Sequence, residues 1–209
     1  RGNLVLNLRS AEGAGSTVAP DAQATFWLAV LGELAFLDAC FPSIHRIAVV
    51  GNDATSLRCD ALCRAFGPTL FRAETGEANV LALARQKQAE GWHVRILGEG
   101  SNGGNITLPS TVRDPLATVF SLLKLLYLGG HPGCSPWECA CRRLGLQTFA
   151  GETTPSERLG LLLSAATEYS STPAFDPEAL VRLSTVDHAA LKKEYEARFT
   201  RTWFERRFG

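Results

Sequence analysis

The sequence predicts an α/β fold, with a mainly parallel sheet, helices on both faces of that sheet, and a helical extension after it. Three observations point to this class. A strand, a polar turn and a helix repeat between residues 44 and 97, a long apolar helix precedes this repeat, and short helices without strands follow residue 130. Strands that alternate with helices of this length form right-handed crossovers, which build a parallel sheet covered on both sides.

The chain begins with a predicted strand and a long helix. Residues 3–8 alternate polar and apolar side chains, which is typical of a strand, and the Gly- and Ser-containing residues 12–17 end it. Asp21 begins a helix over residues 22–41. Its apolar residues recur at helical spacing, at Phe26, Val30, Leu31, Leu34 and Leu37. We expect this helix to be mostly buried.

The repeat consists of a strand at 44–50, a helix at 57–66, a strand at 69–72, a helix at 77–90 and a strand at 93–97. Polar turns that supply helix N-caps precede the two helices. In a parallel sheet the turns near Ser56, Thr75 and Ser101 share one edge, and ligands bind at that edge.

Helices dominate the remainder of the chain. A strongly apolar helix is predicted over 112–128, because Pro115 falls in its first turn and two glycines follow its end. Shorter helices are expected over 137–144 and 156–168. A last helix is expected over 187–207, with apolar residues at every fourth position, Leu191, Tyr195, Phe199 and Trp203.

These patterns divide the chain into three parts. Residues 1–20 are predicted to be a terminal strand and linker, residues 21–130 an α/β domain, and residues 131–209 a helical extension. The 209 residues with 45% hydrophobic content are enough for one good core.

Charge and composition argue against several classes of partner. The 21 basic and 21 acidic residues balance, so neither nucleic acid nor an anionic membrane is expected as a partner. We expect no apolar run of the roughly 18 residues that a membrane span needs. The chain starts without Met and without a basic-then-apolar leader, so a cytoplasmic protein cut from a longer chain is expected.

The six cysteines favour reduced thiols. No pair has the C-x-x-C spacing of a structural zinc site. Cys134, Cys139 and Cys141 cluster near His131, and a metal site there is the alternative interpretation. The four histidines fall in different predicted elements, which favours ordinary core or surface positions over a catalytic role.

The most informative segment is the glycine-rich loop, Gly98-Glu99-Gly100-Ser101-Asn102-Gly103-Gly104-Asn105. It matches the dinucleotide pattern G-x-G-x-x-G, but the next helical pattern starts near residue 111, too late for the helix that holds a pyrophosphate. A purely structural turn is a second interpretation. A loop that binds a polar ligand is favoured, because glycines let the backbone approach a ligand closely.

These residues resemble the third domain of the α-D-phosphohexomutases, in the phosphoglucomutase/phosphomannomutase-like branch. That domain has a sugar-contact loop of the form G-E-x-S-G-G, which residues 98–104 match with one inserted residue. Arg1-Gly2-Asn3 is similar to the tail of the family's metal loop D-x-D-x-D-R, and Arg113-Asp114 opens the helix after the loop. The helix 26–36, the strand at Ile44 and the Thr55-Ser56 turn also agree, so the resemblance spans about residues 1–128.

The resemblance implies a hexose phosphate ligand and an intramolecular phosphotransferase that moves phosphate between C1 and C6 through a bisphosphate. It implies sugar contacts at Glu99 and Ser101, with Gly98, Gly100, Asn102, Gly103, Gly104, Thr75 and Gly76 around them. A carboxylate accepts hydrogen bonds from two adjacent hydroxyls, and a hydroxyl both donates and accepts, so this pair suits a sugar that binds in two orientations.

The resemblance also implies what other parts of a parent protein supply. The phosphoserine, the aspartates that bind Mg²⁺ and the phosphate clamp belong to other domains, so this chain is expected to hold no catalytic residue and no metal, and Arg1 only flanks the metal loop. The family's basic sugar-contact position falls on Ala78, so another residue supplies that contact or the substrate differs. The alternative is a noncatalytic α/β scaffold that binds a protein partner through residues 131–209.

Overall fold

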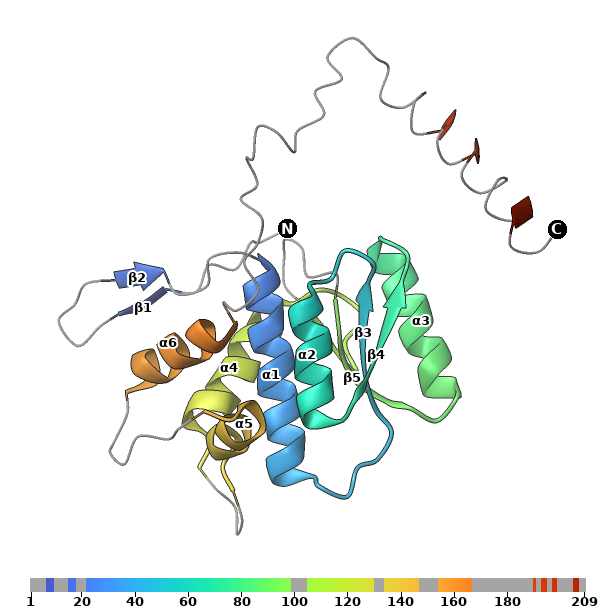
Figure 1. Ribbon diagram of the computed structural model, residues 1–209. Helices are drawn as coiled ribbons and strands as arrows, with labels where there is room; N and C mark the ends of the chain where they lie inside the picture. Colours follow the sequence, from blue (N-terminus) through green and yellow to red (C-terminus); the bar gives the residue numbers. More distant parts are fainter. Residues whose placement is uncertain are drawn as a thin grey trace. The chain divides into compact units, whose positions relative to one another are not determined.

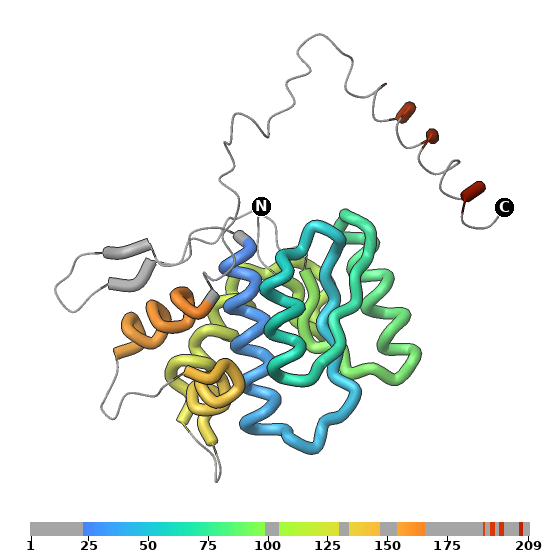
Figure 2. Tube along the Cα trace, in the orientation of Figure 1, coloured from blue at the N-terminus to red at the C-terminus, as the bar shows by residue number. Residues whose placement is uncertain are grey.

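The computed structural model describes residues 7–9, 15–17, 22–98, 105–129, 134–146 and 154–166, and residues 190, 193–194, 197–198 and 205–206. The chain divides into two compact units, Arg1–Tyr169 and Ser170–Gly209. The first unit has an α/β fold, as the sequence predicts (Figures 1 and 2). The domain boundaries expected after residues 20 and 130 stay predictions.

The sheet of the first unit has four strands in the order β4-β3-β5-β6. The strands are β3 (Ile47–Asn52), β4 (Thr69–Ala73), β5 (His93–Leu97) and β6 (Ile106–Thr107). β3 pairs in parallel with both β4 and β5, whereas β6 runs antiparallel to β5. The expectation of a mainly parallel sheet is therefore confirmed.

Helices cover both faces of this sheet, as predicted (Figure 1). α1 (Ala22–Cys40) and α2 (Leu57–Phe66) bury one face, where Val49 and Ile96 join their side chains in one apolar cluster. α3 (Glu77–Ala89) buries the other face, against Ala48, Val50 and Val94. Successive strand residues point to opposite faces, so one run of small apolar residues supplies both layers.

α1 is the centre of the larger apolar cluster. α4 (Pro115–Tyr127) and α5 (Pro136–Leu144) pack against it, and α6 (Pro155–Ala166) contacts α4. α1 and α4 approach closely because position 32 is glycine, where an added Cβ would lie 2.4 Å from the carbonyl oxygen of Ser121. α5 and α6 thus belong to the same compact unit as the sheet.

Local signals in the sequence fix the ends of these helices. The side chain of Asp114 accepts a hydrogen bond from the backbone N–H of Leu116, and Pro115 occupies the first helical position. Ser135 and Glu138 form a capping box at the start of α5. Gly67 and Gly145 end α2 and α5 in the left-handed conformation that favours glycine.

A bulge in β5 sends a charged side chain into the α1 face. The β3–β5 register shifts so that Ala48 pairs with Val94 and Val49 with Ile96, which leaves Arg95 as the extra residue. Its Nε lies 2.7 Å from Oε2 of Glu33, whose side chain is only 1% exposed. Ser121 donates its hydroxyl to Oε1 of the same carboxylate at 2.6 Å, and the ammonium of Lys124 also contacts that oxygen.

The network around Glu33 keeps a carboxylate charged inside an apolar cluster. Burial alone raises the pKa of Glu33, but the hydrogen bonds from Lys124, Ser121 and Arg95 outweigh it and hold the pKa below its usual value of 4.5. The network therefore joins α1, β5 and α4 across the domain.

α1 corrects the expectation that no apolar run has membrane-spanning length. The window 23–40 is long and apolar enough to cross a membrane by length and composition. However, 72% of that window is buried inside the protein, and the core helix of a globular domain meets the same criteria. The expectation failed because Glu33 and Asp38 interrupt the apolar run in the sequence, whereas the mean hydropathy of the whole window stays high enough for a membrane span.

Two segments lie partly outside the described residues. Of the predicted strand at 3–8, the structure describes residues 7 and 8, within β1 (Asn7–Arg9), which pairs antiparallel with β2 (Gly15–Thr17). In the second unit the described residues of the predicted helix 187–207 are helical. Arg198 and Glu194 form an ion pair there at the i, i+4 spacing.

Candidate functional site

The candidate site is the edge of the sheet at the carboxyl ends of β3, β4 and β5. Because these strands are parallel, the segments that follow Asn52, Ala73 and Leu97 leave the sheet on the same side. The backbone N–H of Asp53 donates to the carbonyl of Ala73 at 3.0 Å, and that of Gly98 donates to the carbonyl of Val50 at 3.0 Å. These bonds hold the first residue of two of the segments against the neighbouring strand.

The turn after β3 is fixed by its own side chains. The hydroxyl of Thr55 accepts from the backbone N–H of Asn52 at 2.9 Å and donates to the Asn52 side chain at 3.1 Å. Gln23 of α1 donates to the carbonyl of Ala54 and accepts from the N–H of Ser56. These four hydrogen bonds fix the conformation of the turn and attach it to α1.

Arg72, at the end of β4, braces this turn. Its Nη1 donates to the backbone carbonyls of Asn52 and Thr55, each at 2.8 Å. Its Nη2 lies 2.5 Å from Oδ2 of Asp60 on α2. A guanidinium presents its donors in a fixed fork, and here three of the resulting bonds go to the protein itself. Arg72 therefore holds the turn after β3 and the start of α2 in place.

The turn after β4 places Thr75 and Gly76 at the same edge. Thr75 is exposed and Gly76 half-buried, with φ +135°, a conformation that side chains other than glycine rarely adopt. The carbonyl of Gly76 accepts from the N–H groups of Asn79 and Val80 at the start of α3. The structure thus brings two of the predicted contact residues to the predicted edge.

A basic side chain reaches the same turn from a distant part of the sequence. Nε of Arg113, just before α4, lies 3.0 Å from Oε2 of Glu77, the first residue of α3. Sequence reasoning assigned the cation of this turn to position 78, which is Ala78. It missed the pairing of Arg113 with Glu77, because an ion pair between residues so far apart in the chain leaves no pattern in the sequence.

The glycine-rich loop joins β5 to β6 at this edge. Residues 99–104, which include the predicted contacts Glu99, Gly100, Ser101, Asn102, Gly103 and Gly104, lie outside the described residues. The ends of the loop are described, and they are close together because Leu97 pairs with Ile106 in the antiparallel ladder. The loop therefore starts and finishes at the carboxyl end of β5.

Both ends of the loop are anchored by tight packing. Gly98 is buried, and an added Cβ there would lie 2.7 Å from the ring of Phe26. Asn105 is 1% exposed; its amide nitrogen donates to the Thr107 hydroxyl at 2.8 Å, and its amide oxygen accepts from the hydroxyl of Thr118 on α4. Glycine at 98 thus has a packing reason, and Asn105 is an anchor that sequence reasoning missed.

The described residues provide no metal centre. In the parts of the chain with described coordinates, no group of three His, Cys, Asp or Glu side chains is placed to hold a metal ion. His131 lies outside those parts, and Cys134, Cys139 and Cys141 are free thiols. Burial raises the pKa of Cys139 to about 12 and that of Cys141 to about 11, so both thiols are protonated at neutral pH in this structure.

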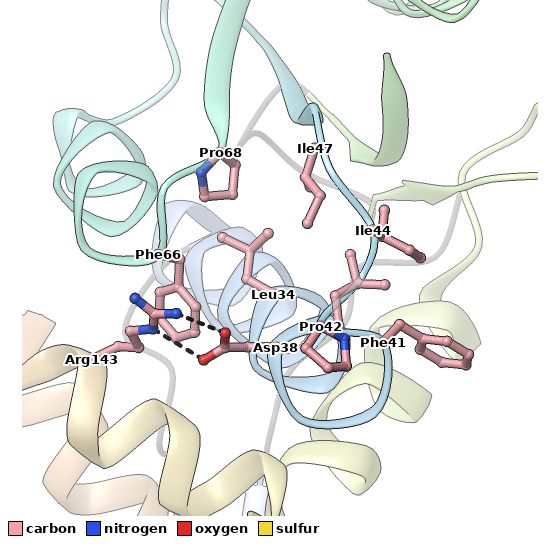
Figure 3. A pocket seen from close by; sticks show the side chains of 10 residues that line it. Leu34, Asp38, Phe41, Pro42, Ile44, Ile47, Phe66, Pro68 and Arg143 are labelled. Atoms are coloured by element: carbon pink, nitrogen blue, oxygen red, sulfur yellow. Dashed lines mark hydrogen bonds and ion pairs between the residues drawn. The ribbon is translucent and has the colours of Figure 1, made fainter. Parts of the chain in front are cut away.

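A pocket of about 170 Å³ lies at the opposite end of the strands (Figure 3). Ile47 and Pro68, at the starts of β3 and β4, line it with apolar residues of α1 and the segment after it. At its rim Arg143 of α5 forms two hydrogen bonds with Asp38, at 3.0 and 2.7 Å. Since ligands of parallel sheets bind at the carboxyl ends, this pocket is not the predicted site.

Comparisons with known proteins give a weak likeness. No protein-family model matches the chain, and no curated protein is similar to it. A solved structure, described as a "putative phosphomannomutase" from Thermus thermophilus, resembles the chain with 18% sequence identity and a TM-score of 0.39. The likeness covers 78% of this chain and 28% of that one, so the chain spans little more than a quarter of that protein.

Proposed function

We propose that this chain is a sugar-phosphate-binding domain of a phosphohexomutase-like enzyme, which moves phosphate between C1 and C6 of a hexose in the cytoplasm. The observation that carries the proposal is the convergence of three segments at one edge of the sheet. The glycine-rich loop is anchored there, the Thr75-Gly76 turn lies there, and Arg113 reaches the same turn. The loop carries one carboxylate and one hydroxyl, the groups that hold a sugar without distinguishing its ends.

Each group has a role in this proposal. Glu99 accepts hydrogen bonds from adjacent sugar hydroxyls, Ser101 donates and accepts, and the glycines admit the ring close to the backbone. Arg113 replaces the cation that Ala78 lacks and binds the anionic end of the ligand. Positioning accounts for much of the rate of phosphoryl transfer, so such a clamp contributes to activity without taking part in bond making.

The remaining machinery is assigned to other domains of a parent protein. The phosphoserine and the Mg²⁺ site belong to those domains in this proposal, and the chain by itself binds hexose phosphate weakly and catalyses nothing. Mutase activity is thus proposed only for the parent protein.

The proposal is tested by titrating the ¹⁵N-labelled chain with mannose 6-phosphate and with glucose 6-phosphate, while following the backbone amides. We expect millimolar affinity and shifts confined to residues 98–105, Thr75, Gly76 and Arg113. Inorganic phosphate is the reference ligand, since it lacks the hydroxyls. The absence of shifts in residues 98–105 at saturating sugar phosphate would count against the proposal.

Two variants separate a specific contact from general charge. Arg113→Ala is expected to weaken sugar phosphate binding about tenfold, the loss of one hydrogen bond to a charged group. Arg85→Ala removes an exposed cation from α3 and serves as the matched control, with affinity unchanged. Equal losses in both variants would show that only the overall charge matters.

A further inference from the structure

α4 presents an apolar stripe on the surface of the first unit. Leu116, Phe120, Leu123 and Tyr127 are each between 45% and 61% exposed. Their spacing of four, three and four residues places them on one face of the helix. Eight large apolar side chains are strongly exposed among the described residues. Six of them lie on or beside α4: the four residues of the stripe, Val112 before the helix and Leu128 after it.

The stripe does not result from a loosely packed helix. The opposite face of α4 is packed into the core, since Leu122, Leu125 and Leu126 are buried in the domain. Lys124 is the single charged residue of the helix, and its ammonium points to Glu33 and lies over the Phe36 ring at 4.6 Å from the centroid. The outward face therefore carries no charge.

We propose that this stripe is a homodimer interface, in which α4 of one copy packs antiparallel against α4 of a second copy. A twofold interface brings the same patch of both copies together, so the patch has to complement itself. The stripe does so about Phe120, because an antiparallel partner helix places Leu116 of one copy against Leu123 of the other. Antiparallel helix dipoles also attract each other.

The area of the stripe fits a weak dimer. Side chains of this size bury roughly 200 Å² when fully covered, so the four residues of the stripe together with Val112, each about half exposed, offer on the order of 500 Å² in each copy. Two copies together bury about 1,000 Å², the lower limit for a biological interface. A face without charge meets its copy without like-charge repulsion, whereas a membrane-surface helix needs basic residues around its apolar face, which α4 lacks.

Sedimentation equilibrium of the full chain tests the proposal. We expect a monomer at about 1 µM and a substantial dimer fraction at about 200 µM, the range for a small interface. Phe120→Glu places a charge at the twofold axis and is expected to leave only monomer at the higher concentration. Leu57→Glu changes a similarly exposed apolar residue on a different helix, α2, and is expected to leave the dimer fraction unchanged.

Three results would overturn the proposal of a homodimer. A monomeric wild-type chain at the higher concentration overturns the proposal, as does a dimer that persists in Phe120→Glu, or one that Leu57→Glu disrupts equally. Thermal unfolding shows whether Phe120→Glu remains folded. If it does not, Tyr127→Lys at the end of the helix introduces a charge into the same stripe with less effect on α4, and the same criteria apply to it.

Discussion

Arg113 is held at the start of α3 by an ion pair with Glu77, Nε to Oε2, at 3.0 Å. The pair ties the segment before α4 to the turn after β4, and both ends of the glycine-rich loop are fixed at the same edge of the sheet. Glu77 and Arg113 are 40% and 20% exposed, so water screens the pair, and its contribution to stability is small. The pair matters because it holds the Arg113 guanidinium beside the turn after β4.

A buried carboxylate and an exposed one provide a matched comparison of stability. Glu33→Gln removes the charge that Arg95 and Lys124 neutralise, and we expect it to lower the free energy of unfolding by about 2–3 kcal/mol, somewhat less than for a fully buried pair. Both cations keep about a quarter of their side-chain surface exposed, which reduces the cost. Glu77→Gln is the control, with an expected loss under about 1 kcal/mol. Urea unfolding at neutral pH measures both, and equal losses would contradict the assigned role of Glu33.

Acid is expected to remove the contribution of Glu33 to the free energy of unfolding. Its pKa in the folded state lies below the ordinary value of 4.5, so the unfolded chain binds a proton more readily than the folded protein. The stabilisation is therefore complete above about pH 4.5 and is lost as the pH falls through the lower folded-state pKa. In a urea series from pH 7 to pH 3, the difference between wild type and Glu33→Gln should narrow below that point. A difference that stays constant over the whole series would show that Glu33 does not titrate as we describe.

A side chain at Gly98, the first residue of the glycine-rich loop, is expected to destabilise the folded protein. Gly98→Ala places a Cβ 2.7 Å from the Phe26 ring, which is itself 4% exposed and has little room to move. We expect a loss of about 1–3 kcal/mol in the free energy of unfolding. Gly129→Ala is the control, because a Cβ there meets nothing within 4 Å. Chemical denaturation measures both variants, and an unchanged midpoint for Gly98→Ala would mean that the Phe26 ring yields freely.

The cysteines are expected to differ in reactivity. Burial raises the pKa of both Cys59 and Cys63 to about 12, so only about one thiol in 10⁴ is ionised at pH 8. We expect maleimide to leave both unmodified in the native protein, whereas Cys40, which is half-buried, reacts. Peptide mass spectrometry before and after denaturation locates the label. If maleimide labelled Cys59 in the native protein as fast as it labels Cys40, the Cys59 thiol would not be buried beneath α2 as the structure shows.

The elements of the first unit could be predicted from local patterns. The helix over 57–66 and the strand over 93–97 coincide with α2 and β5, because an N-cap, a left-handed glycine and a run of apolar residues each act within a few positions. The parallel sheet followed from the alternation of strands and helices. Two short strands were not predicted. β6 has two residues, which carry no periodicity, and β2 falls within residues 12–17, which were expected only to end the first strand.

The parallel order of the strands confirms which turns share one edge of the sheet, whereas ligand binding at that edge stays a prediction. The edge followed from the order of the elements, and the glycine-rich loop from its composition. The pairing of Glu77 with Arg113, the anchoring of Asn105 by Thr118, and the use of Glu33 as a buried hub could not be predicted. Each of these depends on side chains that folding brings together from different elements.

By itself, then, the sequence determined the class of fold, the approximate positions of the helices α1 to α6 and which turns share one edge of the sheet, because propensity, capping and apolar periodicity are local properties. Only the tertiary structure decided which charges are buried, which glycines are needed for close packing and which face of α4 stays exposed. These depend on distances between elements far apart in the chain, and such distances are set when the apolar core closes.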